Sequence, residues 1–461
     1  MPQRRIHVTR PASGTSVAES ADLRLRFDAI RAELDVPAEF PPEVLAEARA
    51  AVASADLPER DETGVPFVTI DPPGSMDLDQ AVHLERDGDG YRVRYAIADV
   101  PAFVRPGGAV DAEARRRGQT IYAPDRRTPL HPTELSEGAA SLLPGEVRPA
   151  FVWDLRAGAD GELVSAEVCR ALVRSRQRHD YGGVQRAVDD GSADELLMLL
   201  RELGEKRIEC ERRRGGASLP LPEQEVAEDE QGHYRLSFRP PLPSEDWNAQ
   251  ISLMTGMAAA AMMVEGGIGI LRTMPEPEHH AVGRFRRAAR GLGIDWPQGE
   301  PYGEFLRSLD RTNPGHLALI HEATSLFRGA GYTAFDGAVP EQATHAAVAA
   351  AYAHVTAPLR RLVDRFGLLV CDALSRGEVV PDWVREALPT LPAAMAASDR
   401  RTSAVERACA DAVEAAVLQD RVGQAFPASV VDLNGKGEHR TATVQVLEPA
   451  VLARADGDAE L

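Results

Sequence analysis

The stretch around which this chain is organised is rich in carboxylates and reads Thr69-Ile70-Asp71-Pro72-Pro73-Gly74-Ser75-Met76-Asp77-Leu78-Asp79-Gln80. The apolar run before it predicts a strand that ends at Asp71. Because Pro-Pro-Gly cannot continue a strand or a helix, a tight loop should bring Asp77 and Asp79 back toward Asp71. Three carboxylates held together repel one another, and Mg²⁺ or Mn²⁺ is the kind of ion that binds carboxylate oxygens. The alternative for the same residues is a polar surface loop.

Length and composition indicate a soluble protein of several domains. The chain has 461 residues, 44% of them hydrophobic and 27% charged, which suits two to four globular domains. The longest apolar run, residues 257–264, is too short to span a bilayer, and no apolar core follows the N-terminus as in a secretory signal. The four cysteines are widely separated, so we expect a cytoplasmic protein with reduced thiols.

The net charge of −19 argues against a nucleic-acid partner when taken alone. It still allows a basic channel inside an acidic shell, because the basic residues are mostly arginines in clusters. These clusters are residues 115–117, 126–127, 212–214, 284–287 and 360–361. Arginine suits fork-like contacts to phosphate, and the alternative for each cluster is a solvated helix face.

The pattern of apolar residues divides the chain into three regions. Residues 1–64 favour helices, at 21–34 and from Pro41-Pro42 to Ala53. Residues 65–420 begin with two hairpins, over 81–98 and 150–168, and continue as helices. Strand-like runs return after residue 421. Asp99 follows the first hairpin and is either a fourth carboxylate of the acidic loop or a residue in a cap or an ion pair.

Two further stretches carry candidate chemistry. Residues 115–132 mix Arg, Tyr and Pro, and Tyr122 beside arginines suits base stacking and phosphate contact, with a core tyrosine as the alternative. A helix is expected to start at Pro358. Arg360 and Arg361 in its first turn would oppose the helix dipole, a cost that an anionic ligand offsets. Their alternative is an ion pair with Asp364.

The order of these pieces resembles the catalytic module of the ribonuclease II/ribonuclease R (RNB) family of exoribonucleases. The matching residues cover roughly 60–420 and stand in the family's order. They are Thr69-Ile70-Asp71, Asp77-Leu78-Asp79, Tyr95-Ala96-Ile97-Ala98-Asp99-Val100, Glu113 to Gly118, Tyr122-Ala123-Pro124-Asp125-Arg126, His345, His354-Val355-Thr356-Ala357-Pro358-Leu359-Arg360-Arg361 and Asp364.

The resemblance implies an α+β multidomain fold. A mixed α/β RNB catalytic domain with a funnel-like RNA channel is expected over residues 65–420. A small helical domain is expected over 1–64, in place of the family's N-terminal cold-shock barrels. A short β-barrel like an oligonucleotide-binding (OB) fold is expected over 421–461.

The resemblance also implies a processive 3′→5′ exoribonuclease that hydrolyses single-stranded RNA to nucleoside 5′-monophosphates. It implies Mg²⁺, with Mn²⁺ as a substitute, at a two-metal site, and the expected metal ligands are Asp71, Asp77, Asp79 and Gln80. The expected catalytic residues are Asp79, Arg360 and Tyr122. The expected RNA contacts are Tyr122, Arg126, Arg117, His345, Thr356, Arg360 and Arg361. We expect a monomer that uses no organic cofactor and no membrane.

This chain departs from the family's pattern at two places. Gln80 stands where the family has a fourth aspartate, so the site loses one negative charge. Ile251-Ser252 stand where the family has a pair of glutamates in a helix. Two alternatives to the exonuclease therefore stay open. One is a catalytically weak RNA-binding member of the family, and the other is a metal-stabilised structural protein with no role in RNA.

Overall fold

The carboxylate stretch lies on a closed five-stranded β-barrel in the computed structural model of the chain. The strands, in barrel order, are β2 (Phe67–Asp71), β3 (Gln80–Asp87), β4 (Gly90–Ala98), β7 (Val147–Ala157) and β8 (Leu163–Asp180). The hairpins β3–β4 and β7–β8 confirm the two predicted ones. The barrel closes because β2 runs parallel to β8, with Asp71 opposite Asp180. This pairing joins residues about 110 positions apart, so no local pattern predicts it.

The structure describes residues 6–9, 17–219, 223–228, 234–311, 313–434, 440–446, 448 and 450–457. In the sequence, β4 and β7 are separated by α3 (Ala109–Arg117) and by the short hairpin of β5 (Ile121–Tyr122) and β6 (Arg127–Thr128). Further elements are β11 (Ile268–Thr273), α7 (His279–Gly291), α8 (Tyr302–Arg307), α9 (Pro314–Ala323), β12 (Gly331–Asp336), β13 (Thr344–His345), β14 (Ala350–Ala351) and α11 (Asp382–Ala387). Among the described residues, no helix is long and apolar enough to cross a membrane.

Helices cover the barrel and share its largest hydrophobic core. They are α4 (Tyr181–Asp190), α5 (Glu195–Arg214), α6 (Pro243–Gly266) and α10 (Leu362–Ser375). Tyr91, Tyr95 and Trp153 of the barrel are fully buried in the same cluster as Met254 of α6 and Phe366 of α10. Burial of large apolar and aromatic side chains is the main stabilising term of such a core. The core therefore fixes the open ends of the barrel strands against α6 and α10.

The predicted start of α10 at Pro358 is wrong. The helix begins at Leu362, because the residues before it pair with the segment that follows α3. The amide of Leu362 donates to the carbonyl of Gly118 at 3.0 Å, and the amide of Thr120 donates to the carbonyl of Arg360 at 3.0 Å. This strand-like pairing holds Arg360 outside the helix, in the turn that faces the barrel.

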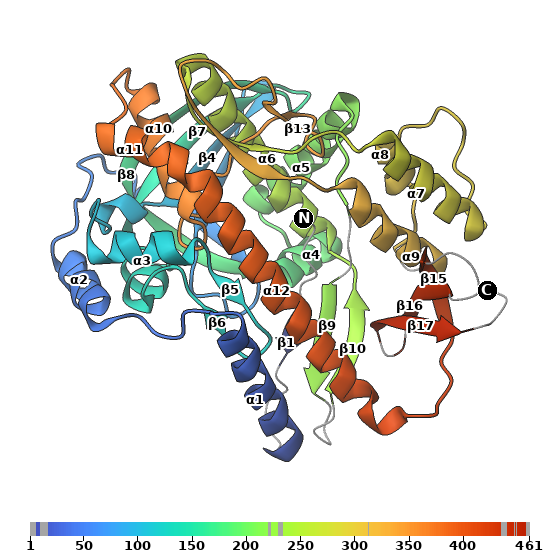
Figure 1. Cartoon of the computed structure of the whole chain (residues 1–461). Coiled ribbons are helices and arrows are strands. Elements are labelled where there is room, and N and C mark those ends of the chain that lie inside the picture. The colour runs from blue at the N-terminus through green and yellow to red at the C-terminus, as the bar shows by residue number, and fades with distance from the viewer. Residues whose placement is uncertain are drawn as a thin grey trace.

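The N-terminal region contains the two predicted helices and a strand that was not predicted. α1 (Val17–Glu33) and α2 (Pro42–Ala53) agree with the sequence pattern. β1 (Ile6–Thr9) pairs in parallel with β9 (Glu223–Glu228), which also pairs with β10 (Tyr234–Arg239). α1 packs on α12 (Leu391–Leu418), the long helix that crosses the molecule diagonally in Figure 1. Residues 1–5 and 10–16 of the predicted 1–64 region lie outside the described residues.

The C-terminal region forms an antiparallel sheet at the far end of α12 (Figure 1). Its strands are β15 (Ala428–Asn434), β16 (Arg440–Val446) and β17 (Val451–Gly457). In the described part of 421–461 these three strands form a sheet that does not close into a barrel. The OB-like barrel expected for this region stays a prediction. Residues 435–439, which join β15 to β16, lie outside the described residues.

Candidate active site

The acidic loop joins the end of β2 to the start of β3 and is pinned by its middle. Leu78 is fully buried, its amide donates to the Ser141 hydroxyl at 3.0 Å, and that hydroxyl donates to the Met76 carbonyl at 2.6 Å. Gly74 supplies the positive φ of 80° that turns the chain back. The loop thus fixes the directions of the two carboxylates that flank Leu78.

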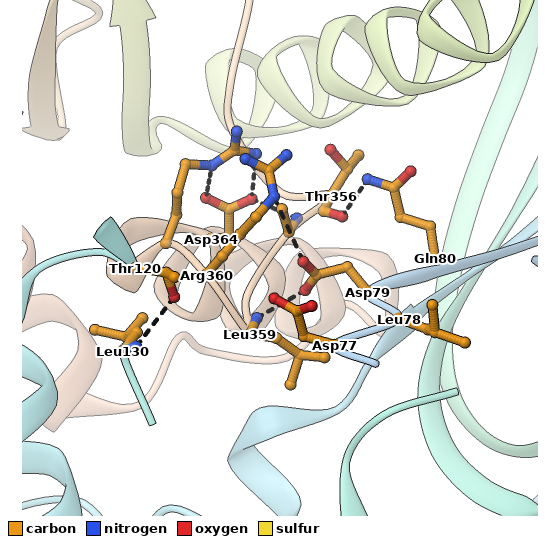
Figure 2. A network of polar contacts seen from close by, with 12 residues as sticks. Asp77, Leu78, Asp79, Gln80, Thr120, Leu130, Thr356, Leu359, Arg360 and Asp364 are labelled. Atoms are coloured by element: carbon orange, nitrogen blue, oxygen red, sulfur yellow. Dashed lines mark hydrogen bonds and ion pairs between the residues drawn. The ribbon is translucent and has the colours of Figure 1, made fainter. Parts of the chain in front are cut away.

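Asp79 is buried between the loop and the turn before α10. Its side chain is about 5% exposed, and its Oδ1 accepts the amide hydrogen of Leu359 at 2.7 Å. Its Oδ2 lies 3.6 Å from the Arg360 Nε. Burial raises the pKa of Asp79 well above its usual value, although Arg360 and the Leu359 amide act in the opposite direction. Figure 2 shows Asp77, Asp79 and Arg360 gathered together, as the sequence predicted.

Asp71 has a buried carboxylate oxygen, Oδ2, that no hydrogen bond satisfies among the residues that the structure describes. Burial, followed by the nearby negative charge of Asp77, raises the pKa of Asp71 to about 7. A cation beside this oxygen would relieve both the lost hydration and the repulsion.

Asp77 is held by the β5–β6 hairpin. It accepts hydrogen bonds from the Arg127 Nη1 at 2.6 Å and from the Tyr122 hydroxyl at 3.2 Å. Tyr122 and Arg127 are opposite each other in the hairpin, so both side chains point to the same face. The predicted RNA contact, Arg126, points elsewhere and pairs with Asp28 at 2.8 Å. Of the arginine cluster 126–127, only Arg126 was predicted as a site residue, although the two-residue alternation of a hairpin was a usable signal for Arg127.

Gln80, a predicted metal ligand, has its amide hydrogen-bonded to other parts of the fold, and its role at the metal stays a prediction. Its Nε2 donates to the carbonyl of Thr356 at 2.7 Å, as Figure 2 shows. Its Oε1 accepts from the hydroxyl of Tyr95 and from that of Ser252, the latter at 3.3 Å. The amide oxygen is therefore within hydrogen-bonding distance of two hydroxyl groups. Thr356 is itself buried and contributes its carbonyl to Gln80.

The two arginines of the turn before α10 have different environments. Arg361 forms a two-point ion pair with the buried Asp364, at 2.9 and 2.8 Å. Asp364 also accepts a hydrogen bond from the amide of Ala357 at 2.7 Å. The side chain of Arg360 is 33% exposed. The alternative reading of an ion pair with Asp364 thus describes Arg361, whereas Arg360 keeps donors directed to the acidic loop.

Three other predicted residues lie outside the acidic cluster. Arg117 is buried and donates to Glu113, to the Pro129 carbonyl and to the Glu39 carbonyl, which argues against the predicted RNA contact. His345 packs edge-on against Tyr352, and burial lowers its pKa to about 4. Asp99 caps the turn that follows β4 and pairs with Arg170 at 2.7 Å, so it is not a fourth carboxylate of the loop.

The donor set fits a divalent cation, although the side chains are not yet arranged as ligands. Within the described residues, no three His, Cys, Asp or Glu side chains stand in the arrangement of a metal site. The buried, unpartnered Oδ2 of Asp71 and the free lone pairs of Asp79 are nevertheless hard oxygen ligands of the kind that Mg²⁺ and Mn²⁺ prefer.

Comparisons with known proteins agree with this geometry. Residues 59–368 match the RNB domain. Ribonuclease R of Escherichia coli is 27% identical over 425 residues, which cover 85% of this chain and 51% of that protein. The solved structure of Mycoplasma genitalium RNase R in complex with ribose-methylated single-stranded RNA superposes with a TM-score of 0.83 at 19% identity, over 94% of this chain and 69% of that one. Yeast Ssd1, described as a pseudonuclease, superposes with a TM-score of 0.71 at 15% identity, over 94% of this chain and 56% of that one.

The coverage of these matches is unequal. The RNB match includes the acidic loop, the β5–β6 hairpin and the turn with Arg360. The chain spans about half the length of the ribonuclease R that it matches. The two structural matches lie below 20% sequence identity and therefore show a shared fold alone.

Proposed function

The chain belongs to the RNB family, and from this premise we propose that it is a processive 3′→5′ exoribonuclease that hydrolyses single-stranded RNA to nucleoside 5′-monophosphates. One observation carries the proposal. Asp79 contacts the turn that contains Leu359 and Arg360, although Asp79 and Leu359 are 280 residues apart in the sequence. Arg360 is also near Asp71, whose buried Oδ2 has no partner among the described residues. Perturbed acids beside a partly exposed arginine are typical of catalytic sites for anionic substrates.

Mg²⁺, or Mn²⁺ in its place, is the cofactor we propose, with Asp71, Asp77 and Asp79 to hold it. When bound, such an ion supplies a Lewis acid that activates water and neutralises phosphate charge. The Nη1 of Arg127 donates a hydrogen bond to the Oδ1 of Asp77 at 2.6 Å and so holds that carboxylate in place. The protein thus fixes the acids before the substrate arrives, which is the preorganisation that electrostatic catalysis needs.

Arg360 is proposed to bind the scissile phosphate. Its Nε faces Asp79 at 3.6 Å, and the pairing of neighbouring backbone groups with Gly118 and Thr120 holds the turn in position. The remaining guanidinium donors are free to contact two phosphate oxygens at once. Negative charge grows on those oxygens in the pentacoordinate transition state, so Arg360 would stabilise the transition state more than the substrate.

Tyr122 is proposed to stack on a base at the 3′ end of the RNA. Its side chain is exposed, at 45%, and its hydroxyl is tied to Asp77 at 3.2 Å. An exposed ring in a fixed direction is what base stacking requires, and stacking of this kind accepts every base. The same hydrogen bond would link the position of the terminal nucleotide to the acidic loop.

A second candidate function is a catalytically weak or inactive RNA-binding member of the family. The observation that favours it is the engaged amide of Gln80, which provides neither charge nor a free oxygen to the site. Release of mononucleotides separates the two candidates.

The test is degradation of a 5′-labelled single-stranded RNA in the presence of Mg²⁺ or Mn²⁺. We expect the wild-type protein to shorten the RNA from its 3′ end and to release nucleoside 5′-monophosphates. Asp79→Asn should lower the rate roughly 10³-fold or more while RNA binding, measured by fluorescence anisotropy, persists. Asp189→Asn, at an exposed position of α4, is the matched control and should retain the wild-type rate. Wild-type activity in Asp79→Asn would refute the site, and absence of mononucleotides from the wild type would refute the function.

A further inference from the structure

We propose that the acidic site takes a single divalent cation and that Gln80 is a hydrogen-bonded strut, not a ligand of a second ion. The inference deepens the proposed function, because it assigns the metal content of the same site. It rests on the contacts of Gln80 and on the balance of charge around the three aspartates.

The amide of Gln80 is committed on both of its sides. Two hydroxyl groups, from Tyr95 and Ser252, donate to Oε1, and Nε2 donates to the Thr356 carbonyl at 2.7 Å. A rotation that turned Oε1 toward the aspartates would break all three hydrogen bonds. It would leave the carbonyl of the buried Thr356 without this donor, and the Tyr95 hydroxyl with Ser252 as its remaining neighbour at 2.7 Å. A buried carbonyl that loses its hydrogen bond is costly, and a neutral amide ligand does not recover that cost.

The strut connects three parts of the fold. Tyr95 belongs to β4, Ser252 to α6, and Thr356 to the segment that leads into the Arg360 turn. The Ser252 hydroxyl also lies 2.7 Å from the Tyr95 oxygen, so its single hydrogen is shared between that oxygen and the Gln80 Oε1. Gln80 and Ser252 are neutral at the two places where this chain departs from the acidic residues of the family it resembles. Since the two side chains touch, the two departures form one neutral network.

The charges around the aspartates favour one ion over two. Arg127 pairs with Asp77 at 2.6 Å, and Arg360 lies 3.6 Å from Asp79. Arg127 also pairs with Glu137 at 2.7 Å, and Arg178 acts on Asp71, so three arginines against four carboxylates leave one net negative charge. One divalent cation would leave a single positive charge, which suits an incoming phosphate. A second cation would leave three positive charges in a partly buried site, where like charges repel strongly.

The oxygens that remain available point to the place of the single ion. The Oδ1 of Asp79 is taken by the Leu359 amide, which leaves its Oδ2. Asp71 offers the buried Oδ2 that has no partner. Of the three acids proposed to hold the ion, Asp71 and Asp79 would therefore be the direct ligands. Asp77 accepts hydrogen bonds from Arg127 and Tyr122 and would contribute its charge.

The experiment counts Mn²⁺ bound to the metal-free full chain in the absence of RNA, by electron paramagnetic resonance and by calorimetry. The wild type should bind one Mn²⁺. Gln80→Asp and Gln80→Asn form a matched pair, since their side chains have the same length and differ in charge. Gln80→Asp should bind a second Mn²⁺, and Gln80→Asn should still bind one.

Two results would overturn the proposal. One is a count of two in the wild type, and the other is a count of one in a folded Gln80→Asp protein. Thermal unfolding reports whether that variant is folded, and Gln80→Glu, which keeps the native length, takes its place with the same expected count if it is not. A wild-type count of two together with mononucleotide release overturns the single ion and leaves the exoribonuclease intact. A count of zero without mononucleotide release overturns both.

Discussion

The two ends of the acidic loop lie on neighbouring strands of one barrel and differ in how well their polar atoms are satisfied. At the end of β2, Asp71 has a buried carboxylate oxygen without a partner. At the start of β3, Gln80 has its oxygen and its nitrogen engaged. Buried polar groups in proteins are mostly paired, and an unpaired carboxylate oxygen beside other acids is suited to bind a cation. The difference assigns chemistry to the Asp71 end and structural support to the Gln80 end.

The largest effect is expected at the chemical end, from loss of the arginine that faces Asp79. Arg360→Ala should lower RNA hydrolysis about 10³-fold, because a positioned arginine stabilises transition-state charge. Arg360→Lys should be intermediate, since an ammonium group cannot form a two-point contact. Arg201→Ala, on the exposed face of α5, is the control and should retain activity. Single-turnover rates with saturating enzyme measure the effect, and a loss confined to RNA affinity would contradict it.

An intermediate effect is expected from protonation of Asp71. The pKa of this carboxyl is raised to about 7 in the metal-free fold, so between pH 4 and 7 the folded protein binds a proton that the unfolded chain has lost. Asp71 should therefore contribute a fall of about 1.4 kcal/mol per pH unit to the free energy of unfolding in this window, and no further fall above pH 7. Asp79, whose pKa is also raised, adds a slope of its own in both proteins. The slopes of the wild type and Asp71→Asn should differ by the Asp71 contribution.

Urea unfolding of both proteins in a chelator, from pH 4 to pH 8, measures the difference. Addition of Mn²⁺ at pH 7.5 should raise the stability of the wild type, because the ion binds the folded state. It should raise that of Asp71→Asn much less. Equal slopes for the two proteins would show that Asp71 is not the unsatisfied acid.

The smallest effect is expected at the structural end. Ser252→Ala removes a hydroxyl that bonds Tyr95 at 2.7 Å and Gln80 at 3.3 Å, which should cost about 1 kcal/mol of unfolding free energy. Hydrolysis should stay within about twofold of the wild type, because the side chain supports the strut and does not contact substrate. Ser54→Ala, at an exposed helix end, controls for the general effect of the substitution. A tenfold loss of activity at unchanged stability would assign Ser252 to the substrate.

The sequence was sufficient where chemistry and chain direction coincide. A strand followed by Pro-Pro-Gly predicts that Asp77 and Asp79 return toward Asp71, and the structure confirms the loop between β2 and β3. The resemblance to the RNB family, which the match of residues 59–368 confirms, predicted that Arg360 lies near the acidic loop. Both inferences rest on features that a short stretch of residues carries.

Features that depend on contacts between distant segments were not predictable. Arg126 and Arg127 are adjacent in sequence, and the pairing of a two-stranded hairpin decides that Arg127 faces Asp77. The backbone bond from Leu362 to Gly118 delays the start of α10. The orientation of Gln80 depends on hydroxyls and a carbonyl from three other elements. A sequence gives the donors and acceptors, whereas tertiary contacts decide which of them meet.

The comparison between the two loop ends is tested most directly by anomalous diffraction from crystals of the protein grown with Mn²⁺. The account predicts one anomalous peak, in contact with the carboxylates of Asp71 and Asp79, with the Gln80 amide still bonded to Thr356. A peak coordinated by the Oε1 of Gln80, or a second peak in the acidic loop, would contradict it.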